Sequence, residues 1–265
     1  MIQLLGCVEL CTAAGERVGI PERARRLLAS LAWSPNTFVP DRTLVQQVWD
    51  DEQPRYPRDA LYTQAARLRK AIRDCQCIGT RADLLRRRGG YVLAMASDVV
   101  DLQRFRDLAR AGVNHERDGD PQSALRALGK ALSLWHGEPL SDIHSPWADT
   151  ARLTLQQEYR AAALLAAELS LCCRRPEECL PQLLQLTSLH PLDESVAGML
   201  MIALHRSGRQ DEALNCFQDI RDRMIEQIGD EPGPRLRGLH QMVLRRDAEL
   251  TSATDTARLE SLTAH

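Results

Sequence analysis

The sequence predicts a mainly α-helical protein of two domains, and three observations support this. Aromatic residues make up only 4% of the 265 residues, and Leu, Ala and Arg dominate, a composition that favours helices packed on helices. Short apolar runs typical of strands occur only before about residue 96, and helical periodicity follows. The charge divides at the same place: residues 1–96 hold 15 Lys and Arg against 10 Asp and Glu, and the remainder hold 19 against 26. We therefore expect a basic domain at 1–96, an acidic helical domain at 97–250 and a flexible tail at 251–265.

The first domain reads as a small antiparallel sheet, three helices and a hairpin. Residues 2–10 and 16–20 carry the short apolar runs of the sheet. The first helix runs from Glu22 to Trp33, and the second begins at Asp41, which we expect to be its N-cap. After the breaker-rich DEQPRYP, in which Pro54 and Pro57 favour extended backbone, a third helix should start near Arg58. A ragged connection around Gly79 leads to LLRRRGGYVLA, where two glycines between apolar runs predict a hairpin.

The third helix, RDALYTQAARLRKAIRD, has two different faces. Leu61, Ala65, Leu68 and Ile72 form one narrow stripe, which we expect to be its core face. The opposite face is small, polar and basic, and its members are Asp59, Thr63, Ala66, Arg67, Lys70 and Asp74, flanked by Tyr62, Arg69 and Arg73. Such a helix suits a DNA major groove, with ridge residues at base edges and arginines at phosphates. Most basic amphipathic helices are simply solvated, but here a short helix and a turn precede it and a hairpin bearing Arg86, Arg87 and Arg88 follows, which favours a helix-turn-helix with a basic wing.

The second domain contains a weak repeat. GDPQSALRAL at 119–128 aligns with GRQDEALNCF at 208–217, and RPEECLPQL at 175–183 lies in the same register. Cys179 and Ala213 are 34 residues apart, the tetratricopeptide period, and Pro191 falls at the expected turn. Small residues at these positions let paired helices approach closely. We expect a stack of helix pairs, interrupted by an insertion that contains GEPLSDIHSPWAD.

Three segments closely resemble one known family: residues 22–72, LRRRGGYVLA, and SGRQDEALNCFQDIRDRMIEQIGDEPGPRLRGLHQMVL. They resemble the Streptomyces antibiotic regulatory protein family, and the resemblance covers about residues 2–248. It implies an OmpR-type winged helix followed by a bacterial transcriptional activation domain built on tetratricopeptide-like repeats. It also implies an activator that binds direct repeats upstream of biosynthetic promoters, as neighbouring protomers or a homodimer, and helps RNA polymerase with its sigma factor to engage them.

The residues expected at these contacts fall into two sets. The candidate DNA contacts are Arg25, Arg42, Arg58, Asp59, Tyr62, Thr63, Ala66, Arg67, Arg69, Lys70, Arg73, Arg86, Arg87, Arg88 and Tyr91. By resemblance to OmpR-type activators, the candidate polymerase contacts are Asp51, Glu52, Gln53, Arg55 and Tyr56. Family recognition helices commonly begin Asn-Ala-Leu-Gln, whereas this one begins Asp59-Ala60-Leu61-Tyr62, so the bases that it reads are left open.

Other classes of function have less support. Gly129-Lys130 resembles the end of a phosphate-binding loop, but Ala124 and Ala131 replace the glycine and the hydroxyl residue that such a loop needs, so we expect no enzyme and no cofactor. The eight cysteines lack paired zinc spacing and are read as reduced thiols. No apolar stretch reaches membrane-spanning length, so we expect a cytoplasmic protein. The remaining alternative is a helical-repeat adaptor that binds only protein.

Overall fold

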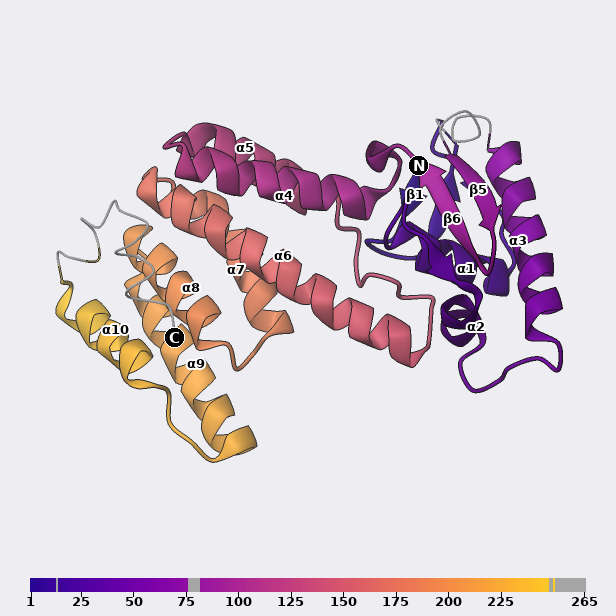
Figure 1. Ribbon diagram of the computed structural model, residues 1–265. Helices are drawn as coiled ribbons and strands as arrows, with labels where there is room; N and C mark the ends of the chain where they lie inside the picture. Colours follow the sequence, from indigo (N-terminus) through magenta and orange to yellow (C-terminus); the bar gives the residue numbers. More distant parts are fainter. Residues whose placement is uncertain (13, 76–81, 248–249, 251–265) are drawn as a thin grey trace. The chain divides into compact units, whose positions relative to one another are not determined.

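The computed structural model describes residues 1–12, 14–75, 82–247 and 250; Cys77, the connection around Gly79 and the predicted tail 251–265 lie outside this part. The described chain is mainly helical with two small sheets, as predicted (Figure 1). Its elements are β1 (Ile2–Gln3), β2 (Glu9–Cys11), β3 (Arg17–Val18), α1 (Glu22–Ala32), β4 (Val39–Pro40), α2 (Asp41–Trp49), α3 (Pro57–Asp74), β5 (Ala82–Arg87), β6 (Gly90–Met95), the 3₁₀ turn η1 (Ser97–Val99), α4 (Asp101–Arg117), α5 (Pro121–Leu132), α6 (Pro146–Cys172), α7 (Pro176–Leu189), α8 (Glu194–Arg206), α9 (Gln210–Ile228) and α10 (Pro234–Arg245).

Contacts between residues divide the chain into two compact units. The first unit holds residues 1–110 and 130–157, and the second holds 111–129 and 158–265. Helices α4, α5 and α6 therefore each contribute to both units. The domain bounds predicted from the sequence, 1–96 and 97–250, stay a prediction.

Two three-stranded antiparallel sheets lie in the first unit. In the N-terminal sheet, Ile2 lies opposite Leu10 and Leu10 opposite Val18, which confirms the sheet expected there. The second sheet has the strand order β4-β6-β5 and contains the expected hairpin, with Leu84 opposite Leu93. Strand β4 was missed, because two residues ending in a proline carry no periodic signal and suit only a sheet edge.

The starts of α2 and α3 differ slightly from the prediction. Asp41 is the first residue of α2 and not its N-cap; Pro40 holds the N-cap position, and no side chain caps the helix. The Asp41 carboxylate is instead hydrogen-bonded to Arg86 of the hairpin. Helix α3 begins at Pro57, one residue earlier than expected, because the fixed φ of proline suits the first helical position, where no N–H is needed.

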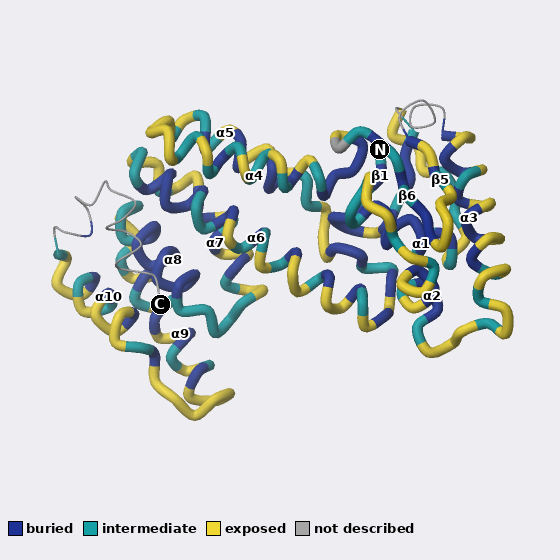
Figure 2. The backbone as a smooth tube through the Cα atoms, viewed as in Figure 1, coloured by how far each residue is buried: buried dark blue, intermediate teal, exposed yellow. Residues whose placement is uncertain are grey.

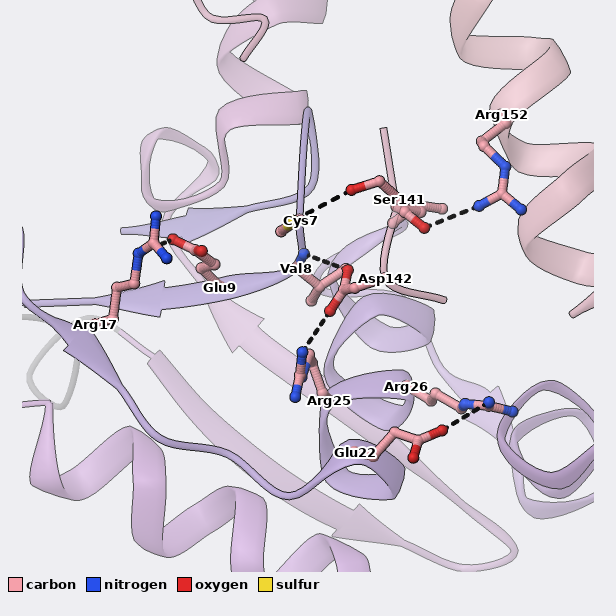
Figure 3. Close-up of polar contacts among 11 residues, drawn as sticks. Cys7, Val8, Glu9, Arg17, Glu22, Arg25, Arg26, Ser141, Asp142 and Arg152 are labelled. Carbon is pink, nitrogen blue, oxygen red and sulfur yellow. Dashed lines mark hydrogen bonds and ion pairs between the residues drawn. The ribbon is translucent and has the colours of Figure 1, made fainter. Parts of the chain in front are cut away.

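The segment 133–145, which contains most of the GEPLSDIHSPWAD stretch of the predicted insertion, belongs to the first unit. Its backbone N–H groups at His136 and Leu140 donate to the carbonyls of Leu5 and Leu4 at 2.9 and 3.1 Å. Asp142 accepts from the Val8 N–H at 2.8 Å and pairs with Arg25 at 2.6 Å (Figure 3). A stretch that the sequence places between helical repeats thus completes the fold of the first unit.

The second unit consists of antiparallel helix pairs. All three repeat segments begin a helix, namely α5, α7 and α9, and their small residues Ala124, Cys179 and Ala213 are at most 2% exposed. This confirms the register of the repeat, and α7 and α8 are separated at Pro191 as expected. A Cβ atom at Gly112 would lie 2.7 Å from Leu128, so α4 and α5 approach too closely for a larger residue there.

No helix in the described ranges is both long and apolar enough to cross a membrane.

Candidate nucleic-acid interface

Helix α3 buries the predicted stripe and exposes the predicted basic face (Figure 2). The exposed fractions of Leu61, Ala65, Leu68 and Ile72 are at most 2%, and Gln64 and Ala71 are buried beside them. The opposite face is exposed throughout, and its members are Asp59, Tyr62, Thr63, Ala66, Arg67, Lys70, Arg73 and Asp74. The apolar stripe therefore holds the helix to α1 and α2 and leaves one side open to a ligand.

Several basic side chains near this face have no acidic partner within the described residues. On α3 these are Arg58, Lys70 and Arg73, together with Arg67, whose nearest polar contact is Gln64 at 3.5 Å. On the hairpin they are Arg87 and Arg88, which lie at the turn between β5 and β6 and are exposed. Arg42, in the first turn of α2, is also exposed. Uncompensated cations on one surface attract a polyanion.

A second group of predicted contacts is held by other parts of the protein. The Arg69 Nε donates to the Leu84 carbonyl of β5 at 2.9 Å, and Arg86 donates to both carboxylate oxygens of Asp41 and to the Gly90 carbonyl. The hydrogen bond to Asp41 raises the pKa of Arg86 above its ordinary value. These two arginines fasten the hairpin to α3 and to the start of α2.

Two further predicted contacts are less accessible than the sequence suggested. Tyr91 is 1% exposed, and its ring lies beneath the guanidinium groups of Arg86 and Arg69, at 4.5 and 5.8 Å. Its side chain therefore supports these arginines and does not reach a ligand on the surface. Arg25 is half-buried and is paired with Asp142 (Figure 3), so its charge is largely compensated.

The ridge of α3 carries the residues that could distinguish one base from another. The Thr63 hydroxyl donates to the Asp59 carbonyl at 3.0 Å, which leaves its methyl group and a lone pair toward solvent. Tyr62 is 63% exposed. Asp59 lies in the first turn of the helix, where the helix dipole stabilises a negative charge.

The loop between α2 and α3 contains the candidate polymerase contacts, all of them exposed: Asp51, Glu52, Gln53, Arg55 and Tyr56. Arg23 of α1 holds the start of this loop by donating to the Val48 carbonyl and to Glu52, both at 2.9 Å. Gln53, Arg55 and Tyr56 line an open hollow of about 700 Å³, together with residues of α2 and the start of α3. The loop is thus exposed to solvent while its start is fixed to α1 by Arg23.

Sequence reasoning missed the residues that fix the hairpin. A Cβ atom at Gly90 would lie 2.3 Å from the Val39 carbonyl and 2.6 Å from the Phe38 ring, so only glycine fits between β4 and the hairpin. The side-chain amide of Asn36 pairs with the backbone of Met95 as the backbone of a neighbouring strand would. Its Nδ2 donates to the Met95 carbonyl at 2.9 Å, and its Oδ1 accepts from the Met95 N–H at 3.0 Å. The only sequence signal for this close approach was Gly90 itself, which the sequence analysis interpreted as a turn residue of the hairpin.

No group of three or more His, Cys, Asp or Glu side chains that could hold a metal ion occurs in the part of the chain that the structure describes.

A helix-turn-helix whose second helix is basic and exposed, followed by a β-hairpin, defines the winged-helix class of fold. The family model for the bacterial transcriptional activator domain matches residues 100–244. The chain belongs to the Streptomyces antibiotic regulatory protein family of transcriptional activators.

Individual relatives agree with this assignment. The chain is 32% identical over 233 residues to the regulatory protein DnrI of Streptomyces peucetius, covering 86% of both chains. It is 36% identical over 243 residues to the regulatory protein AfsR of Streptomyces coelicolor, covering 89% of this chain and 23% of AfsR, so it spans about a quarter of that relative. The solved structure of EmbR from Mycobacterium tuberculosis, in complex with a low-affinity phosphopeptide, matches 99% of this chain and 67% of its own with a TM-score of 0.83 and 26% identity.

Proposed function

We propose that this protein binds promoter DNA in a sequence-specific manner through α3 and the β5–β6 hairpin, and activates transcription from there. The observation that carries the proposal is the exposed row of cations on α3, which no described acidic residue neutralises. Family membership supports it, because the relatives are regulatory proteins.

The geometry suggests that different residues of α3 and the hairpin would provide affinity and sequence preference. Placed in a major groove, α3 would set Arg58, Arg67, Lys70 and Arg73 against phosphates, where they contribute affinity without sequence information. Asp59, Thr63 and Ala66 on the ridge would face base edges and determine the preferred sequence. Arg87 and Arg88 at the hairpin turn would reach the neighbouring backbone or minor groove.

Activation also requires contacts to the transcription machinery. We assign these to the exposed loop at 51–56 and the hollow beside it, with RNA polymerase and its sigma factor as the partner. Two copies would bind side by side on direct repeats. The controlled promoters would be those of secondary-metabolite genes. The protein would act in the cytoplasm, by binding DNA and not by catalysing a reaction.

A promoter-binding experiment tests the proposal. The full chain is titrated into labelled duplexes with the repeat region of a candidate promoter and with a scrambled sequence, at several salt concentrations. We expect tighter binding to the repeat, a steep loss of affinity as salt rises, and a footprint that extends when polymerase is added. An adaptor that binds only protein would show no duplex binding at low salt, which would overturn the proposal.

A further inference from the structure

Phe38 is a large aromatic side chain that the proposed interface leaves unused. It lies between α1 and α2, one residue before β4, and it is 45% exposed. Its ring lies against Gly90 of β6, because a Cβ atom at Gly90 would be only 2.6 and 2.7 Å from two carbons of that ring. The ring therefore covers the start of the strand that follows the hairpin turn, while nearly half of the residue stays open to solvent.

Backbone hydrogen bonds on both sides hold Phe38 in place. The N–H of Asn36 donates to the Leu93 carbonyl at 2.9 Å, and the N–H of Asp41 donates to the Gly89 carbonyl at 2.8 Å. Between these bonds, β4 pairs with β6. A residue whose backbone is already fixed loses little conformational freedom when its side chain meets a ligand.

Phe38 and Arg87 flank Gly90 on the same face of the sheet. Arg87 of β5 lies directly opposite Gly90 in the antiparallel pair, and residues that lie opposite each other direct their side chains to one face. The Cβ direction of Gly90 meets the Phe38 ring, so the ring lies on this face too. Tyr91, the next residue along β6, faces the other way and is buried. An aromatic ring and a cation thus lie together on the outer face of the hairpin, beside its turn.

The hairpin turn adds positive charge next to this ring. Arg87 and Arg88 are exposed and have no acidic partner within the described residues. The Asp41 carboxylate, which lies beside the turn, is neutralised by Arg86. A partner that fits this surface therefore carries anions along the border of an apolar surface. The minor groove of duplex DNA has this chemistry, because rows of phosphates border the C–H surfaces of its deoxyribose rings.

We propose that Phe38 packs against deoxyribose rings at the edge of the minor groove, beside the phosphates that Arg87 and Arg88 contact. The inference rests on the proposed function, because α3 must occupy the adjacent major groove to bring the hairpin there. Phe38 then supplies an apolar share of the affinity, which the cations of α3 and the hairpin do not supply. Burial of apolar surface releases no counterions from DNA, so this share does not depend on salt.

The experiment titrates the full-length wild type and variants into one labelled duplex, the repeat region of a candidate promoter, at several salt concentrations. Phe38→Ala should bind roughly tenfold more weakly at every salt concentration, with the slope of log affinity against log salt unchanged, because it removes only apolar contact area. Arg87→Ala/Arg88→Ala should instead make the slope shallower by about 2, since it removes two phosphate contacts. Phe38→Leu keeps an apolar side chain over Gly90 and should lose less affinity than Phe38→Ala.

Two controls accompany the titration. Leu244→Ala removes an apolar side chain of similar exposure, 47%, from α10 in the second unit, and should bind like the wild type. Hydroxyl-radical footprinting reports on deoxyribose rings directly, and Phe38→Ala should lose protection at the sugars beside the hairpin. Thermal unfolding of each variant shows that the proteins compared are folded.

The outcomes separate this inference from the proposed function. If the wild type binds the duplex and folded Phe38→Ala binds equally well, the inference is wrong and the DNA interface stands. A shallower salt slope in Phe38→Ala, like that of the double arginine variant, would mean that the ring only holds the hairpin in position, which would overturn the inference as well. Absence of duplex binding by the wild type would overturn both proposals.

Discussion

Asp41, the first residue of α2, accepts hydrogen bonds from both terminal nitrogens of Arg86 in β5, and its own N–H donates to the Gly89 carbonyl at 2.8 Å. One residue thus ties the hairpin turn to the helix-turn-helix through its side chain and its backbone. The wing is held in place by a pair that sequence analysis had assigned to two other roles, an N-cap and a DNA contact.

This relationship predicts the behaviour of two variants. Arg86→Ala and Asp41→Ala should each lower the free energy of unfolding by about 1 kcal/mol, because each removes this partly exposed, hydrogen-bonded pair, and Arg86→Ala also removes the hydrogen bond to the Gly90 carbonyl. In a double-mutant cycle followed by urea unfolding, the two effects should be non-additive, since they remove the same interaction. Strictly additive losses would show that the two side chains act independently.

Gly90→Ala tests the close approach of β4 to the hairpin. Because a Cβ atom there would lie 2.3 Å from the Val39 carbonyl, the strands must separate, and we expect a loss of stability of roughly 2 kcal/mol or more. Gly129→Ala is the matched control, because a Cβ atom at Gly129 meets nothing within 4 Å and alanine favours the helix. Equal melting temperatures for the two variants would contradict the packing described for Gly90.

Asp101 should make stability depend on pH. Its carboxylate is 1% exposed and accepts the backbone N–H groups of Leu4, Leu5 and Leu102, but burial outweighs these bonds and raises its pKa to about 6 from 3.8. A pKa raised on folding means that the folded state holds the proton more tightly than the unfolded state. The stabilisation is therefore present below about pH 4 and is lost as pH rises toward 6.

The measurement for Asp101 is urea unfolding of the wild type and Asp101→Asn between pH 4 and 7. The stability of the wild type relative to the variant should fall with rising pH by up to about 3 kcal/mol, since other titrating groups are common to both. A relative stability that rises over this range would mean that the three N–H donors dominate instead.

Much of the fold follows from local sequence patterns. The stripe of Leu61, Ala65, Leu68 and Ile72 predicts the buried face of α3, and the repeat register predicts the starts of α5, α7 and α9. Both succeed because helical periodicity and small residues at close contacts act over short distances in the chain. The hairpin was found for the same reason, from apolar runs on either side of two glycines.

What the sequence could not show depends on distant partners. Nothing local distinguishes Arg86 and Arg69, which hydrogen-bond to other parts of the protein, from Arg67 and Lys70, which have no acidic partner among the described residues. The same applies to the segment 133–145, whose packing on the first unit depends on backbone bonds to residues 4 and 5. These contacts join residues that lie up to 136 positions apart (Leu4 and Leu140), beyond the reach of any periodicity.

The central claim is that the exposed cations of α3 lie against DNA phosphates, and salt titration of Arg67→Ala/Lys70→Ala tests it most directly. Duplex binding by fluorescence anisotropy gives the slope of log affinity against log salt for this double variant, the wild type and Arg245→Ala on α10. We predict that the slope of the double variant is shallower by about 2, close to one for each lost phosphate contact, whereas Arg245→Ala leaves it unchanged. Identical slopes for all three proteins would contradict the placement of α3 against DNA.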